Sequence, residues 1–421
     1  IYSKEDLIIN GNGTLNVNAG YRNGIKSTDD CIIVSGTLNI TSTEDGIIGK
    51  DLCGIVAGDI NINAGSDGIK STYDTDTTKG NVIIEGDNIT IKASNDGIQA
   101  ENILVINDGT INIKTNNGAA DTTQTHTDNM YMGRGGFGFN NNKTTTTTDD
   151  TSESRKGIKA GNMLIINDGD ITIDSDDDSV HCNSEIYIYG GTINAATGDD
   201  GVHADDLLTV NGGTINITQC YEGIEADDIV INDGDISVVS SDDGINSSDG
   251  SITINGGNLL INASGDGLDA NGSIIINGGY IVVLGPTSDG DTAIDYDDSC
   301  TINGGTVMAF GSSGMLEIPK GASNGACIVT AFTSVSGGSK YTLSDSNGNE
   351  ILSYTPSKAY AAAIVYSDKI TTGNTYNITA GSTTLSIEVT SDVTSNVSSG
   401  FGGAGGMNKP GNGGSGMPNN G

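Results

Sequence analysis

A short motif that returns about every 22 residues is the feature that most constrains how this chain folds. The motif is Gly-Ile-x-Ala/Ser or a close variant. A repeat of this length indicates a stacked architecture in which each unit packs on its neighbours. The Gly, or the residue in its place, stands at 24, 46, 68, 97, 118, 157, 179, 201, 223, 244, 267 and 293.

Each period holds three short apolar segments separated by turns. An apolar run ending in Asn-Asp/Gly-Gly follows the motif, as in LIINDG at 164–169, and an alternating segment such as GTINI at 213–217 comes next. Gly, Asn and Asp favour turns, and no segment has the period of a helix. We therefore predict an all-β fold, a right-handed parallel β-helix of about twelve coils over residues 1–317. At about 4.8 Å per coil, the rod would be roughly 60 Å long.

The Asn before each Gly pair forms a second repeating column. Asn side chains stacked at one turn can hydrogen-bond along the stack, and Asn tolerates the turn conformation, so we interpret this column as structural. It contains Asn107, Asn167, Asn211, Asn232, Asn255, Asn277 and Asn303, and Tyr189 interrupts it.

Three segments fall outside the repeat. Residues 118–156 hold an insertion rich in Thr, Asn and Gly, which is either a surface loop or, through Tyr131 and Arg134, a segment that closes over a ligand or a neighbouring subunit. Residues 318–390 read as antiparallel strands that would cover the end of the rod. Residues 391–421 have the composition of a linker.

Carboxylates dominate the column just before the motif Gly. Stacking would place these like charges about 4.8 Å apart, which is unfavourable unless a cation offsets them. Further carboxylates stand one position earlier and at the outward x position. The candidate metal ligands are Asp177, Asp178, Asp199, Asp200, Glu222, Glu225, Asp242, Asp243, Asp266, Asp269, Asp291 and Asp295.

Two interpretations of this acidic ladder remain open. Clustered carboxylate oxygens suit Ca²⁺, which accepts 6–8 oxygen ligands in flexible geometry. Alternatively, Asp-Gly is a turn pair, so a repeated turn repeats its Asp without any metal. Because paired Asp residues on consecutive coils exceed what a turn needs, we expect at least one Ca²⁺ site.

The outward x column also carries cations. Lys159 could abstract a proton from a Ca²⁺-bound uronate, which is lyase chemistry, or it could relieve repulsion between acidic neighbours. His181 and His203 stand one coil apart, and we interpret them as a salt-bridged pair at the ligand-binding surface rather than a transition-metal site. Cys31 and Cys53 share a column at a spacing that permits a disulfide, although buried thiols are the simpler expectation.

Composition excludes several classes of protein. The chain has 54 acidic and 18 basic residues, a net charge of −36, so its surface would repel nucleic acid. It has no apolar run of about 18 residues that could span a membrane. No signal peptide is visible before the strand-like start at Ile1, so we expect a mature form or a fragment.

Residues 156–246 resemble the clostridial carbohydrate-binding β-helix family of surface proteins. The runs DDGVHADD, CYEGIEA and SDDGIN carry the resemblance, which extends over roughly residues 1–390. It implies a fold similar to that of the family nine pectate lyases, binding of Ca²⁺, of acidic plant polysaccharide such as polygalacturonate and of cellulose, and secretion to the surface of a Gram-positive bacterium. The sequence lacks the dense acidic run with a well-placed Lys that the lyases need.

Three functions are consistent with these features. The first is a non-catalytic, calcium-assisted binder of acidic polysaccharide, in which Ca²⁺ bridges the ladder to the sugar. The second is a calcium-dependent polysaccharide lyase. The third is a subunit of an extracellular filament, assembled through open strand edges at the ends of the β-helix and through the tail. The absence of Trp argues against stacking on crystalline cellulose.

Overall fold

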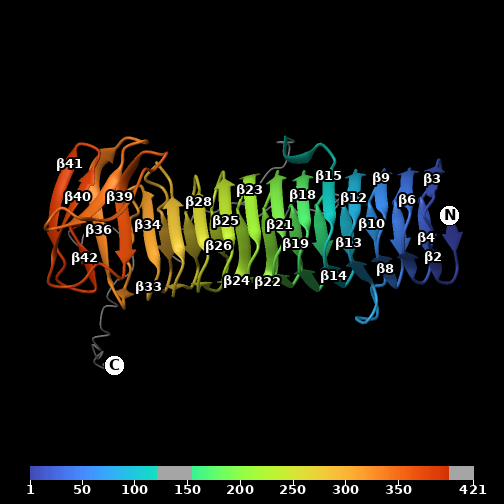
Figure 1. Ribbon diagram of the computed structural model, residues 1–421, viewed down its shortest axis with the longest axis horizontal. Coiled ribbons are helices and arrows are strands. Elements are labelled where there is room, and N and C mark those ends of the chain that lie inside the picture. The colour runs from blue at the N-terminus through green and yellow to red at the C-terminus, as the bar shows by residue number, and fades with distance from the viewer. Residues whose placement is uncertain (121–153, 398–421) are drawn as a thin grey trace, which may run out of the picture.

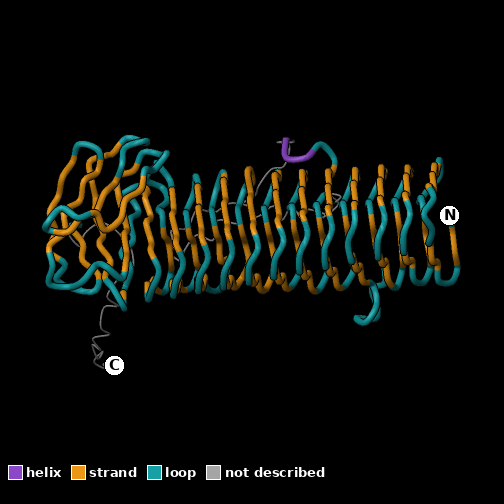
Figure 2. The backbone as a smooth tube through the Cα atoms, viewed as in Figure 1, coloured by secondary structure: helices purple, strands orange, loops and turns teal. Residues whose placement is uncertain are grey.

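The computed structural model describes residues 1–120 and 154–397, which form a long rod with a small antiparallel unit at one end (Figure 1). The predicted fold class is confirmed, with about 13 turns of parallel β-structure. Figure 2 shows that strands and turns alternate regularly along the rod. The helical element of the described residues is a single 3₁₀ turn, η1 (Gly118–Ala120). No helix in this part of the chain has the length and apolar character to cross a membrane.

Every coil contributes strands to three faces. The first face holds β1 (Tyr2–Ser3), β4 (Ile25–Ser27), β7 (Ile47–Gly49), β10 (Ile69–Lys70), β13 (Ile98–Ala100), β16 (Ile158–Ala160), β19 (Val180–Cys182), β26 (Ile245–Ser247), β29 (Leu268–Ala270) and β32 (Ile294–Tyr296). The second holds β2 (Leu7–Ile9), β5 (Cys31–Ile33), β8 (Leu52–Ile55), β11 (Asn81–Ile84), β14 (Ile103–Ile106), β17 (Met163–Ile166), β20 (Glu185–Ile188), β27 (Ile252–Ile254), β30 (Ser273–Ile276), β33 (Ser299–Ile302) and β35 (Gly321–Ala322).

Two long strands, β22 (Val202–Val210) and β24 (Ile224–Ile231), run through both of these faces and join them into one sheet. The third face is a separate sheet. Its parallel strands are β3 (Thr14–Ala19), β6 (Thr37–Ser42), β9 (Asp59–Ala64), β12 (Asn88–Ala93), β15 (Thr110–Thr115), β18 (Asp170–Ser175), β21 (Thr192–Thr197), β23 (Thr214–Cys220), β25 (Asp235–Ser240), β28 (Asn258–Asn262), β31 (Tyr280–Leu284) and β34 (Thr306–Gly311).

The insertion interrupts the chain but not the stack. Ile98 pairs directly with Ile158, so the coil of β13 to β15 lies next to the coil of β16 to β18. Our placement of Gly118 in the repeating column is therefore wrong, because Gly118 begins η1 beside the stack. The insertion itself, with Tyr131 and Arg134, lies largely outside the described residues.

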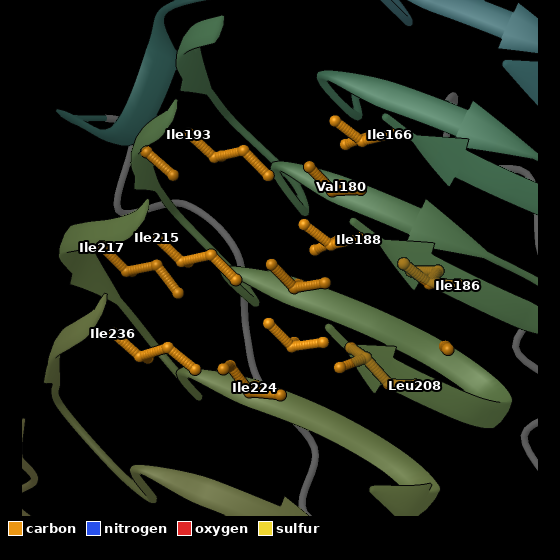
Figure 3. Close-up of a cluster of buried hydrophobic side chains, with 14 of the residues drawn as sticks. Ile166, Val180, Ile186, Ile188, Ile193, Leu208, Ile215, Ile217, Ile224 and Ile236 are labelled. Carbon is orange, nitrogen blue, oxygen red and sulfur yellow. The ribbon is translucent and has the colours of Figure 1, made fainter. Parts of the chain in front are cut away.

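The interior is a continuous column of aliphatic side chains. Side chains alternate in direction along each strand, so every second residue, commonly Ile, Val or Leu, points into the interior. Figure 3 shows such side chains from facing sheets, including Ile188, Leu208 and Ile215, which are fully or almost fully buried. Fully burying one such side chain contributes about 1.5–3 kcal/mol. The stacked coils thus supply a core that no single coil could form.

The predicted Asn ladder is confirmed. The Asn167 amide donates to Asn107 at 2.7 Å, and Asn232 donates to Asn211 at 2.9 Å. The ladder continues from Asn255 to Asn232, from Asn277 to Asn255 and from Asn303 to Asn277. A second ladder, which we did not predict, links Asn16, Asn39 and Asn61 on the third face.

All six cysteines are free and buried. Cys31 and Cys53 are register neighbours on β5 and β8, as predicted, but no disulfide joins them. Burial raises the pKa of the Cys31 thiol to about 12, so this thiol behaves as a small apolar side chain.

The antiparallel unit closes the third face. Strand β39 pairs antiparallel with β34 and so ends the parallel stack on this face. A separate four-stranded sheet has the order β38-β37-β40-β41. The strands are β36 (Ala326–Val335), β37 (Tyr341–Asp345), β38 (Glu350–Tyr354), β39 (Tyr360–Ser367), β40 (Thr375–Ala380), β41 (Thr383–Glu388) and β42 (Val393–Ser395).

The unit has its own apolar core, which includes Met308 and Phe310 on β34 as well as Tyr341 and Tyr360.

Two boundaries differ from our predictions. Strand β35 continues the parallel second face beyond residue 317, and β42 pairs with β36 inside the segment we predicted as linker. Residues 398–421 lie outside the described part of the chain.

Most coils need Gly at the motif position because consecutive coils lie too close there for a side chain, although Ser179 and Ala293 occupy this position in two coils. A Cβ at Gly201 would be 2.5 Å from the Gly223 carbonyl oxygen and 2.4 Å from Ile217 Cδ1. Real Cβ atoms do not approach other atoms so closely. The motif therefore repeats its Gly for packing rather than for turn conformation.

We predict that Gly201→Ala lowers the free energy of unfolding by about 1–3 kcal/mol, because the added methyl group overpacks the coil interface. Urea titration followed by circular dichroism measures this loss. Gly20→Ala is the matched control, since a Cβ there has no atom within 4 Å. Equal stability of the two variants would contradict this packing argument.

Candidate functional site

The acidic ladder runs along the turns that lead into the first face, and most Asp residues just before the motif position use one carboxylate oxygen to accept a backbone N–H of the next coil. The backbone N–H of Asp200 donates to Asp178 Oδ1 at 3.1 Å, and that of Asp266 donates to Asp243 Oδ1 at 2.6 Å. Asn23 does the same for the N–H of Asp45. An amide is thus sufficient for this structural role, and the charge of the carboxylates needs another explanation.

In the middle of the rod, basic side chains face the second carboxylate oxygen. Lys70 Nζ lies 2.6 Å from Asp67 Oδ2, and Lys156 Nζ lies 2.6 Å from Asp178 Oδ2. Each ion pair offsets the charge of a carboxylate that is almost fully buried. In these coils the ladder is balanced by the protein itself.

The outward x column changes from basic to acidic along the rod. Its strands pair in register, so each x residue lies directly beside the next. From the insertion onward, the order is Lys159, His181, His203, Glu225, Asn246, Asp269 and Asp295. Beyond His203 the ladder therefore faces more carboxylates instead of cations.

Asp243, Asp266 and Asp269 form the acidic cluster at the centre of this unbalanced region. One carboxylate oxygen from each lies within 4.8 Å of the others. Burial, reinforced by neighbouring carboxylates, raises the pKa of Asp243 and of Asp266 to about 8 and that of Asp269 to about 6. Within residues 1–120 and 154–397, none of the three forms an ion pair. The arrangement suits a divalent cation with oxygen ligands.

Other predicted ligands flank this cluster. Burial, followed by the charge of Glu225, raises the pKa of Glu222 to about 8, and Asn246 donates to Glu222 Oε2 at 2.8 Å. Burial also raises the pKa of Glu225 to about 7, and that of Asp295 above its usual value. Two further predicted ligands, Asp242 and Asp291, are half-buried in the turns on the same side.

Asp177, Asp178 and Asp199 form a second cluster, but Lys156 already neutralises part of it. Its ammonium lies 2.8 Å from Asp177 Oδ1 as well as close to Asp178. This cluster is therefore a weaker candidate for calcium. Lys156 is a competing cation that we did not predict.

Three of the predicted ligand-binding residues, Lys159, His181 and His203, are register neighbours on the paired strands β16, β19 and β22. Lys159 is half-buried, and its Nζ donates to Ser154 Oγ at 3.2 Å. His181 and His203 lie side by side with ring centroids 4.9 Å apart. Tyr131 and Arg134 lie outside the described residues. We also missed a cluster of Asp6, Asp29 and Asp30 near the start of the rod. The adjacent pair Asp29-Asp30 before β5 is the sequence feature that could have indicated it.

Asp243 accepts a backbone hydrogen bond and also carries an unfavourable buried charge, and these two roles can be separated by mutation. We expect Asp243→Asn to raise the free energy of unfolding of the metal-free protein by about 1–2 kcal/mol at pH 8, because it removes an unfavourable charge and keeps the acceptor for Asp266 N–H. Asp243→Ala loses that acceptor and should be about 1–3 kcal/mol less stable than Asp243→Asn. Urea unfolding in the presence of chelator measures the stability of both variants. If the two variants were equally stable, Oδ1 of residue 243 would have no structural role.

Comparison with known proteins gives one match. Residues 1–201 and 199–312 match the family described as carbohydrate-binding domain-containing protein. No curated protein and no solved structure matches the chain. The two matched segments together span the coils from β1 to β34, including the acidic cluster. The chain therefore belongs to the family of carbohydrate-binding domain-containing proteins.

Proposed function

We propose that the protein is a non-catalytic binder of acidic polysaccharide and that it uses Ca²⁺ held at the acidic cluster. Membership of the family supports carbohydrate as the partner. The observation that carries the calcium proposal is the cluster of Asp243, Asp266 and Asp269, whose carboxylates converge without an ion-pair partner among the described residues. A location at the surface of a Gram-positive bacterium is part of the same proposal.

Charge explains why an ion is needed for such a partner. The chain carries a net charge of −36, so the bare rod repels a polyuronate. Ca²⁺ takes 6–8 oxygen ligands, and the three clustered side chains provide only part of this shell. Water and the carboxylate or hydroxyl oxygens of a sugar can complete it. The ion then attracts the anionic chain that the protein alone would exclude.

We predict that polygalacturonate in a native gel retards the protein in millimolar Ca²⁺ and not in chelator. Replacing all three cluster residues by Asn should abolish the calcium-dependent retardation. The matched control replaces Asp249, Asp297 and Asp298, exposed acids outside the cluster, by Asn and removes the same charge. Migration that Ca²⁺ does not change, or equal loss in both triple variants, would rule out a role for this cluster.

The pH dependence of stability provides an independent test. The raised pKa values mean that the folded protein binds more protons than the unfolded chain between pH 4 and pH 8. Without metal, the melting temperature should therefore fall as the pH rises from 5 to 8. Ca²⁺ binds the ionised carboxylates of the folded state, so it should raise the melting temperature more at pH 8 than at pH 5. Scanning calorimetry at both pH values, with calcium and with chelator, makes the comparison.

The same material tests the two alternative functions. A lyase would release unsaturated products from polygalacturonate, visible as a rise in ultraviolet absorbance with calcium present. A filament subunit would show elongated assemblies by electron microscopy. The proposed binder gives neither signal and still shows calcium-dependent retardation.

A further inference from the structure

His181 and His203 stand among carboxylates in a way that their role as a salt-bridged pair does not explain. His181 on β19 and His203 on β22 are register neighbours. His181 Nδ1 lies 2.8 Å from Asp178 Oδ2, and His203 Nδ1 lies 3.1 Å from Asp200 Oδ2 and 3.5 Å from Glu225 Oε2. Two imidazole nitrogens and several carboxylate oxygens thus face one small region, which we call the histidine cluster.

The buried nitrogen of His181 is the second observation. His181 is 8% exposed, and among the described residues its Nδ1 makes no hydrogen bond, although Asp178 Oδ2 lies 2.8 Å away. The opposite nitrogen, Nε2, contacts Asn183 Oδ1 at 2.9 Å. A proton on Nε2 satisfies that contact and leaves the Nδ1 lone pair directed at the cluster. A metal-binding imidazole has this arrangement: one nitrogen faces the ion, and the other donates a hydrogen bond to a group that is not itself a ligand.

The spacing fits ligands that share one ion. Zinc binds nitrogen and oxygen at about 2.0–2.2 Å, so two neighbouring ligands of one tetrahedral ion are roughly 3.3–3.6 Å apart. The contacts from the two Nδ1 atoms to Asp178, Asp200 and Glu225 range from 2.8 to 3.8 Å. The ligand atoms of Asp178, His181 and His203 all lie within 4.8 Å of one another.

We propose that the histidine cluster is a binding site for a borderline transition-metal ion, Zn²⁺, with His181, His203, Asp178 and Asp200 as ligands and Glu225 beside them. Imidazole nitrogen favours zinc over calcium, which prefers oxygen alone. Lys156 competes for Asp178 Oδ2, and its contact with Asp177 gives the ammonium a second partner when the ion enters. The ligands nearest to the calcium cluster, Asp200 and His203, lie three coils before Asp266, and the site does not depend on the calcium proposal.

Zinc retention tests the proposal. Metal-free full-length protein is mixed with one equivalent of Zn²⁺ in millimolar Ca²⁺, desalted and analysed for metal. We expect about one zinc per chain in the wild type and in Asp243→Asn. His181→Gln combined with His203→Gln should lose it. All six cysteines remain in that double variant, so undiminished zinc there would mean thiol binding and would overturn the proposal.

A second variant and a spectrum guard against misfolding of the double variant. Asn183 is exposed, so Asn183→Ala should fold, and loss of its contact with His181 should weaken zinc binding about 10–100-fold. Co²⁺ in place of zinc should give visible absorption bands of a four- or five-coordinate ion with nitrogen ligands. Absence of zinc and of these bands in the wild type, or unchanged zinc affinity in Asn183→Ala, would overturn the assignment.

Discussion

Hydrogen bonding between the backbones of stacked coils is the constraint on which the rest of this structure depends. It fixes neighbouring coils about 4.8 Å apart, so every residue lies beside the equivalent residue of the next coil. Identical aliphatic side chains gain from this arrangement, because each buries the other. Identical Asn side chains also gain, since an amide both donates and accepts. Identical carboxylates do not, because they repel at that distance.

The acidic ladder shows how the chain manages this repulsion. Most Asp residues just before the motif position use one oxygen to accept a backbone N–H from the next coil, as Asp178 does for Asp200. The other oxygen meets Lys70 or Lys156 in the middle of the rod. Towards the antiparallel unit, no Lys or Arg of residues 1–120 and 154–397 forms an ion pair with Asp243 or Asp266, and burial among other carboxylates raises the pKa of both. The coils whose carboxylates are neutralised by Lys thus have a structural role, and the coils whose carboxylates lack such a partner are the candidates for binding an ion.

Local sequence predicted some parts of the site better than others. The column of carboxylates was visible because the motif repeats. The neutralisation of Asp178 by Lys156 was only partly visible: the period places the two residues side by side, but the direction of the ammonium group, which contacts both Asp177 and Asp178, needed side-chain positions. Gly118 was misplaced for a similar reason: a motif match cannot show whether a segment joins the stack or leaves it. The two histidines were found as neighbours, but the burial of His181 Nδ1 needed side-chain positions.

The sequence by itself determined the parallel β-helix, the Asn ladder and the acidic ladder, because a fixed period makes each residue's neighbours the equivalents of itself one repeat away. Only the tertiary structure decided which carboxylates are neutralised, which converge within ligand distance, and where β39 replaces the next coil on β34. The first two features depend on side-chain direction, and the third depends on contacts with a segment outside the repeat. Periodicity therefore specifies the columns, and three-dimensional packing specifies the sites within them.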